Sequence, residues 1–131
     1  MLAALEALVK LESPTEDLQA CQDVIKLASD LATKVLGTPA EIRDVNGRPV
    51  FWWGANNPEV VVLAHLDTVW PKGSFTPLWK VEGTKATGPG IFDMKAGFIQ
   101  ALYAMKGITG SVALVATTDE ETGSATSKEF I

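Results

Sequence analysis

The sequence of 131 residues contains little cysteine, few basic residues and no long apolar run. The single cysteine, Cys21, excludes an internal disulfide framework, and its place in a helical pattern indicates a small buried side chain rather than a nucleophile. Eleven Lys and Arg against 16 Asp and Glu give a net charge of −5, which argues against a nucleic-acid surface. No apolar run approaches the roughly 20 residues of a membrane span.

The first residues lack the basic region and the continuous apolar core of a secretion signal, so we expect a cytoplasmic protein. Hydrophobic residues make up 47% and charged residues 21% of the chain, an ordinary globular balance. The length suits one domain with a real core.

Apolar periodicity predicts a helix over residues 2–11 and a second helix that Ser13 caps and Gly37 ends. Asn46-Gly47 predicts a hairpin between strands 40–45 and 48–53, in which Pro49 indicates an edge position. The remaining predicted elements are a small hairpin (79–82 and 85–87), a helix (94–105), a strand (111–118) and a last helix capped by Ser124.

Five apolar residues, 60–64, lead without a break into the only histidine, His65. Such a run predicts a strand buried on both faces. Asp67 follows two residues later, so in extended backbone the two side chains share a side, and the carboxylate can hold one ring nitrogen while the other faces outward. A metal-ligating histidine uses this arrangement, although a histidine that only ends a strand and hydrogen-bonds locally gives the same pattern.

Two further acidic elements follow at equal spacings along the chain. Asp93 precedes the helix over 94–105, and Glu120 and Glu121 follow the second buried strand. Buried strands separated by a helix predict an α/β sheet with parallel pairing across that crossover. Ligands of such sheets bind beyond the carboxyl ends of the strands, where all three elements can converge.

Taken singly, each acidic element has a simpler explanation, since a carboxylate at a helix start is often a cap and an acidic run is often a solvated loop. Three consecutive carboxylates after an apolar strand repel one another unless a cation compensates them. Mixed His, Asp and Glu donors suit zinc, cobalt or manganese, and the absence of a thiolate disfavours a structural zinc site.

Three stretches resemble the N-terminal motifs of the di-zinc aminoacylase/carboxypeptidase family, which includes acetylornithine deacetylase, succinyl-diaminopimelate desuccinylase and glutamate carboxypeptidase. The stretches are 62–69 (VLAHLDTV), 88–97 (GPGIFDMKAG) and 117–124 (TTDEETGS). Residues 70–73 (WPKG) and the Gly-Pro-Gly form of the second motif look most like the glutamate carboxypeptidase branch.

The resemblance implies a zinc-dependent hydrolase that cleaves the amide bond of a peptidyl- or N-acyl-amino acid. It implies that His65 binds one zinc, Asp93 bridges both, and Glu121 binds the second. Glu120 would be the general base toward a metal-bridging water, and Asp67 would orient His65. It also implies a cis peptide bond between Asp93 and Met94.

The implied fold is a three-layer αβα sandwich with a mixed sheet, of which residues 1–131 form the N-terminal part of a single catalytic domain. The family's lid and dimerisation domain, its C-terminal half and two further zinc ligands have no counterpart in this sequence. We therefore expect weak zinc binding, no detectable hydrolysis by this chain alone, and self-association through an uncovered sheet edge, with a homodimer in the parent protein.

Two other interpretations stay open at this point. One is a non-catalytic member that uses the same fold to bind metal or a protein, against which the presence of Glu120 argues. The other is an unrelated acidic α/β binding domain. For an enzyme, acyl- or peptidyl-glutamate is the favoured substrate, and deacylation of another N-acyl amino acid is the alternative.

Overall fold

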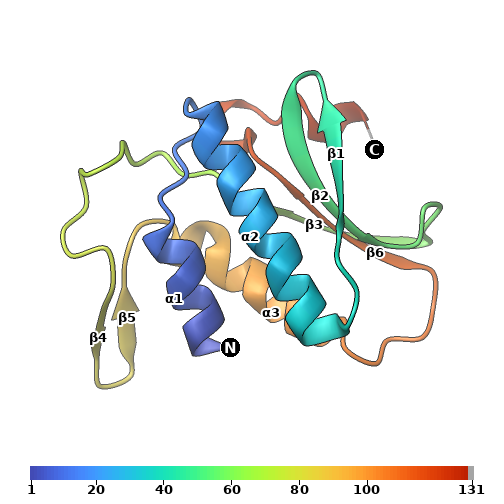
Figure 1. Ribbon diagram of the computed structural model, residues 1–131, viewed down its shortest axis with the longest axis horizontal. Coiled ribbons are helices and arrows are strands. Elements are labelled where there is room, and N and C mark those ends of the chain that lie inside the picture. The colour runs from blue at the N-terminus through green and yellow to red at the C-terminus, as the bar shows by residue number, and fades with distance from the viewer. Residues whose placement is uncertain (130–131) are drawn as a thin grey trace.

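A computed structural model describes residues 1–129. A four-stranded sheet in the order β1-β2-β6-β3 forms its centre, with three helices beside it (Figure 1). β2 runs antiparallel to β1 and β6, whereas β3 and β6 are parallel, so the predicted mixed α/β sheet is confirmed. The strands are β1 (Glu41–Val45), β2 (Arg48–Gly54), β3 (Val60–His65) and β6 (Val112–Thr117).

The three helices lie on one side of the sheet, where the second and third pack against the strands and the first packs against the other two. They are α1 (Leu2–Lys10), α2 (Leu18–Leu36) and α3 (Ala96–Ala104). The core on this face joins apolar side chains of the helices to alternate residues of the strands, such as Phe51 in β2 and Leu114 in β6. A smaller cluster of Val50, Trp52, Ala113 and Val115 lies on the opposite face, as the period-two alternation of strands requires.

The prediction that β3 is buried on both faces was wrong. Val60, Val61 and Leu63 are 54%, 45% and 41% exposed, because β3 is an edge strand and its outward face is uncovered. An apolar run alone does not distinguish a central strand from an edge strand whose face is open. The exposed apolar edge that we expected is confirmed.

Two further sequence predictions need correction. The predicted edge position of Pro49 is wrong, because β2 is an interior strand. Pro49 pairs with β1 and precedes the residues from Phe51 onward that pair with β6, so its missing N–H removes no hydrogen bond to β6. Asp17, not Ser13, caps α2 by accepting the N–H of Ala20 at 2.9 Å. Gly37 ends α2 with φ of 82°, as predicted.

The segment before α3 is irregular, and this positions Asp93. Residues Ile91–Lys95 form one wide helical turn that non-helical backbone at Asp93 and Met94 interrupts, and α3 begins only at Ala96. The peptide bond between Asp93 and Met94 is cis, as the family resemblance implied. A small hairpin of β4 (Lys80–Glu82) and β5 (Lys85–Thr87) precedes this segment, also as predicted.

The acidic stretch after β6 forms short turns instead of a capped helix. Glu120–Thr122 and Ser127–Glu129 are single 3-10 turns, and Ser124 between them has φ of 55°. The predicted capping by Ser124 is therefore wrong within the described residues. Among residues 1–129, no helix has both the length and the apolar character needed to cross a membrane.

Candidate metal centre

His65 ends β3 and lies at the carboxyl edge of the parallel pair, opposite Thr117 of β6. The residue is only 4% exposed, and both of its ring nitrogens contact protein groups. Nδ1 lies 3.3 Å from both the carboxylate and the backbone carbonyl oxygen of Asp67, as expected from their spacing, and Nε2 lies 2.9 Å from Oδ1 of Asp93. Glu120 Oε2 lies 3.7 Å from the same Nε2. The imidazole therefore contacts carboxylates at both nitrogens.

The acidic turn completes a second grouping around the imidazole. Ligand atoms of His65, Glu120 and Glu121 all lie within 4.8 Å of one another. Asp93 stands outside this group and reaches the centre through its contact with Nε2. The structure thus brings all five predicted site residues to one edge of the sheet. They include Glu120, which we had predicted to be a base, alongside the predicted ligands.

Asp67 fixes the geometry of this edge. It is fully buried, and its two oxygens accept the backbone N–H groups of Glu120 at 3.4 Å and Glu121 at 3.3 Å. Thr15 donates its hydroxyl to Oδ2 at 2.7 Å. One carboxylate therefore connects the imidazole, the acidic turn and a segment near the N-terminus.

Sequence reasoning missed Thr15 because it assigned residues 13–16 to a helix start. The segment instead runs parallel to the residues after His65: Thr68 N–H donates to Ser13 O, and Thr15 N–H donates to Thr68 O. The Ser13 hydroxyl donates to Leu66 O at 2.6 Å. Nothing in the local pattern indicates this long-range pairing.

Two basic residues near the centre also escaped the sequence analysis. Arg48 donates to the carbonyl oxygens of Thr15 and Thr118 at 2.6 and 3.1 Å. Lys95, fully buried, donates to the carbonyl oxygens of Leu8 and Leu11 at the end of α1, and burial lowers its pKa to about 8. These side chains tie the segments that carry the site residues to the N-terminal helices.

The charges at the centre favour a cation. Burial alone would lower the pKa of His65, but the hydrogen bonds to Asp67 and Asp93 outweigh it and raise this pKa to about 9. Burial raises the pKa of Glu121, and the neighbouring Asp93 carboxylate adds to this effect. Carboxylates that hold a proton on the imidazole would equally hold a divalent ion there, and imidazole with carboxylate donors is a set that zinc accepts. The residues present therefore fit a zinc ion.

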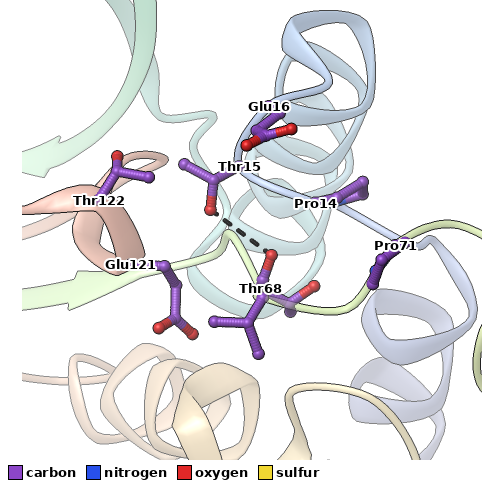
Figure 2. A pocket seen from close by; sticks show the side chains of 8 residues that line it. Pro14, Thr15, Glu16, Thr68, Pro71, Glu121 and Thr122 are labelled. Atoms are coloured by element: carbon purple, nitrogen blue, oxygen red, sulfur yellow. Dashed lines mark hydrogen bonds between the residues drawn. The ribbon is translucent and has the colours of Figure 1, made fainter.

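Open space adjoins the centre on more than one side. A cavity of about 310 Å³ is lined by His65, Asp93 and Glu120. Another cavity, of about 290 Å³, lies between the segment of Pro14 to Glu16, the segment after Asp67, and the turn that carries Glu121. Figure 2 shows the side chains that line it. The side chain of Glu121 runs beside Thr68 at this pocket, away from Thr15 and Thr122 (Figure 2). A small molecule can thus approach the carboxylates.

The chain belongs to Peptidase family M20/M25/M40, whose model matches residues 61–131, more than half of the sequence. This match covers all five site residues. The family resemblance expected from the three motifs is therefore confirmed.

Among known proteins, carboxypeptidase G2 of Pseudomonas sp. (strain RS-16) is 36% identical over 86 residues, which are 60% of this chain and 21% of that protein. An M20 family metallo-carboxypeptidase from Sulfolobus solfataricus has a similar fold, with a TM-score of 0.77 and 21% identity over 99% of this chain and 33% of that one. Human carnosine dipeptidase 1 gives a TM-score of 0.73 at 21% identity, over 98% and 33%. The chain thus spans about a fifth to a third of these proteins.

Proposed function

We propose that the metal centre belongs to a zinc-dependent hydrolase that cleaves the amide bond of a peptidyl- or N-acyl-amino acid, and that residues 1–131 are the N-terminal part of its catalytic domain. The observation that carries this proposal is the contact of a buried imidazole with Asp93 and the Glu120–Glu121 turn, at one edge of a peptidase-family fold. The identity with carboxypeptidase G2 supports a carboxypeptidase-like substrate. Acyl- or peptidyl-glutamate is the favoured substrate, and deacylation of a different N-acyl amino acid is the alternative.

In this proposal His65 and Asp93 would hold one zinc, and Asp93 and Glu121 would hold a second. Bound zinc would supply Lewis acidity to the scissile carbonyl and to a water. Asp67 keeps Nε2 of His65 turned toward Asp93 by holding Nδ1 with its carboxylate and its backbone carbonyl, each 3.3 Å away, which also selects the tautomer of the ring. A cytoplasmic location and self-association through the open edge of β3 stay predictions.

Glu120 is the proposed general base. Its side chain is 49% exposed, so it can meet a substrate, while its backbone N–H is anchored on Asp67. It accepts a proton from the attacking water and returns it to the amine nitrogen as the C–N bond breaks, which leaves a carboxylic acid and a free amine. The presence of this carboxylate favours the hydrolase over a non-catalytic member of the fold.

Zinc titration of matched variants tests these roles without requiring turnover. Asp93→Asn and Glu121→Gln remove proposed ligands, and we expect each to weaken zinc binding at least about tenfold. Glu120→Gln keeps the shape of a residue that we propose is not a ligand, so zinc affinity should stay within about twofold of the wild type. If Glu120→Gln weakens zinc as much as Glu121→Gln, Glu120 is a ligand and the proposed division of roles is wrong.

The zinc-loaded chain should also be incubated with an N-acyl-glutamate. Each zinc would have only two protein ligands here, so we expect weak binding and no detectable release of glutamate. Robust turnover by the pure chain would contradict this expectation and would show that these residues suffice.

A further inference from the structure

Lys95 is a buried charged residue that lies two positions after Asp93. Its ammonium is enclosed by protein and donates to the carbonyl oxygens of Leu8 at 2.9 Å and Leu11 at 3.0 Å, which are 87 and 84 residues away in the sequence. Both oxygens lie at the end of α1, where a helix leaves carbonyl groups without intrahelical N–H partners and where a positive charge complements the helix dipole. Lys95 therefore joins the end of α1 to the turn that carries Asp93.

The main chain of Lys95 closes the same turn. Its N–H donates to the carbonyl oxygen of Gly90 at 2.8 Å, so Asp93 lies inside a loop that begins at Gly90 and ends at Lys95. The side chain then passes Gly90, where a Cβ would stand 3.6 Å from Cδ of Lys95. The end of α1 lies beside this loop (Figure 1). One residue therefore both closes the loop and fastens it to a helix.

The direction of the Asp93 carboxylate depends on how this loop is held. Its side chain is 69% exposed, and its hydrogen-bond partner among residues 1–129 is Nε2 of His65 at 2.9 Å. The backbone of Asp93 is not helical, with φ of −122° and ψ of 98°, so the regular hydrogen bonds of α3 do not fix it. A movement of the loop would therefore carry the carboxylate away from the imidazole.

We propose that Lys95 is a positioning residue for the metal centre: its ammonium, bound to the end of α1, holds the loop so that the carboxylate of Asp93 meets Nε2 of His65. This inference rests on the proposed function, in which Asp93 would hold both zinc ions. Lys95 acts through Asp93, because its own ammonium contacts the two carbonyl oxygens of α1. A shift of this one carboxylate would affect both ions.

The charge of Lys95 alone predicts the opposite effect, and this gives the test its sign. Lys95 lies close enough to Asp67 for their charges to attract, so its positive charge also repels a divalent ion at the centre. Loss of that charge alone would tighten zinc binding, whereas loss of the contact with α1 would weaken it. Lys95→Met removes the ammonium and keeps most of the apolar stem. We expect its zinc affinity at pH 7, in competition with a fluorescent chelator, to fall about tenfold.

Leu31→Ala is the matched control for a general loss of stability. Leu31 is buried in the core, and it lies about 20 Å along α2 from Asp17, the N-cap of this helix. Loss of its side chain destabilises the fold, but the zinc affinity of the folded protein should stay within about twofold of the wild type. If Leu31→Ala weakens zinc binding as much as Lys95→Met, reduced stability explains the loss and the positioning role is wrong.

Lys95→Gln provides a second variant in case Lys95→Met does not fold. Its amide can still donate to one of the two carbonyl oxygens, so we expect a loss of zinc affinity in the same direction but smaller, about threefold. An affinity equal to that of the wild type, or tighter, would overturn the proposal.

A double-mutant cycle shows whether Lys95 acts through Asp93. In the Asp93→Asn background, Lys95→Met should weaken zinc binding less than about twofold, because the ligand that it positions is already lost. Independent losses that multiply would contradict the proposal. A readout without metal is the ¹⁵N signal of Nε2 of His65, which Lys95→Met should shift in the same direction as Asp93→Asn does, and which Leu31→Ala should leave unchanged.

The two readouts separate this inference from the proposed function. If zinc leaves the ring signals of the wild-type His65 unchanged, the proposed metal function is contradicted, whereas the shift of Nε2 in metal-free Lys95→Met still supports the positioning of Asp93. If Asp93→Asn weakens zinc binding but Lys95→Met leaves it unchanged or tightens it, the positioning role is overturned and the proposed metal function stands.

Discussion

Replacement of Thr15 by valine tests how much of the site depends on the buried carboxylate of Asp67. Valine has nearly the shape of threonine, so the change removes the hydroxyl that donates to Oδ2 of Asp67 at 2.7 Å, together with its longer contact of 3.5 Å to the carbonyl oxygen of Thr68 (Figure 2). Asp67 is fully buried, so water cannot replace the lost donor. A hydrogen bond to a charged group contributes about 1.5–3 kcal/mol, and we expect the free energy of unfolding at pH 7 to fall by about 2 kcal/mol.

Thr118→Val is the matched control. Thr118 is also fully buried, but its hydroxyl donates to a neutral carbonyl, that of Pro49, at 3.3 Å. Loss of a neutral bond should cost about 1 kcal/mol. Urea unfolding followed by tryptophan fluorescence measures both variants. If Thr15→Val costs no more than Thr118→Val, the charge of Asp67 does not strengthen the bond and the reasoning fails.

The pH dependence provides a second readout for Thr15→Val. Burial opposes ionisation of Asp67, but hydrogen bonds from His65 and Thr15 outweigh it and hold the pKa of Asp67 below its ordinary value of 3.8. A depressed carboxyl pKa stabilises the fold above the ordinary value, and this stabilisation is lost as pH falls through the lowered pKa. The cost of Thr15→Val should therefore stay constant from pH 7 to about pH 4 and shrink below it, whereas the cost of Thr118→Val should not change.

Three further predictions concern other contacts of the site. Asp67→Asn should weaken zinc binding about 10- to 100-fold in competition with a fluorescent chelator, because the carboxylate orients His65; unchanged affinity would contradict this. Burial lowers the pKa of Lys95 to about 8 in the folded chain, whereas its ordinary value is 10.5. Between these two pH values the unfolded chain binds more protons, so the free energy of unfolding should rise with pH there by up to about 3 kcal/mol. Chemical unfolding of Lys95→Met should show no such rise. Gly90→Ala should lower the stability of the fold by about 2–3 kcal/mol in thermal melts, because the added Cβ would stand 2.6 Å from Cγ2 of Thr68. Gly73→Ala is the control: Gly73 has a similar φ but no atom near the position of a Cβ, so the loss should be about 1 kcal/mol.

Sequence patterns predicted those parts of the fold that depend on neighbouring residues. Asn46-Gly47 defined its hairpin, the helical stripe ended at Gly37 as expected, and the parallel pairing of β3 with β6 followed from the helix between them. The convergence of the five candidate residues at one edge of the sheet could be predicted because each follows directly after a strand or precedes a helix, while their roles stay predictions. These features are encoded locally, so one sequence suffices to find them.

The remaining features depend on contacts between distant segments. The exposure of β3 depends on what lies beside the sheet, and the place of Pro49 depends on how far β6 extends. Thr15 and Lys95 contribute through backbone and side-chain partners far away in the sequence. Local periodicity carries no information on such pairings, because any amphipathic or polar segment could supply the donor.

The position of Asp67 also has a consequence for the order in which the protein is made. Its partners lie 52 residues before it, at Thr15, and 53 and 54 residues after it, at Glu120 and Glu121. Contacts at such separations close late, since each requires a long loop to be ordered first. During synthesis, His65 and Asp93 are added to the chain before the acidic turn. The donors of the metal centre therefore come together only after about nine-tenths of this chain has left the exit tunnel, and until then a cation meets unassembled donors.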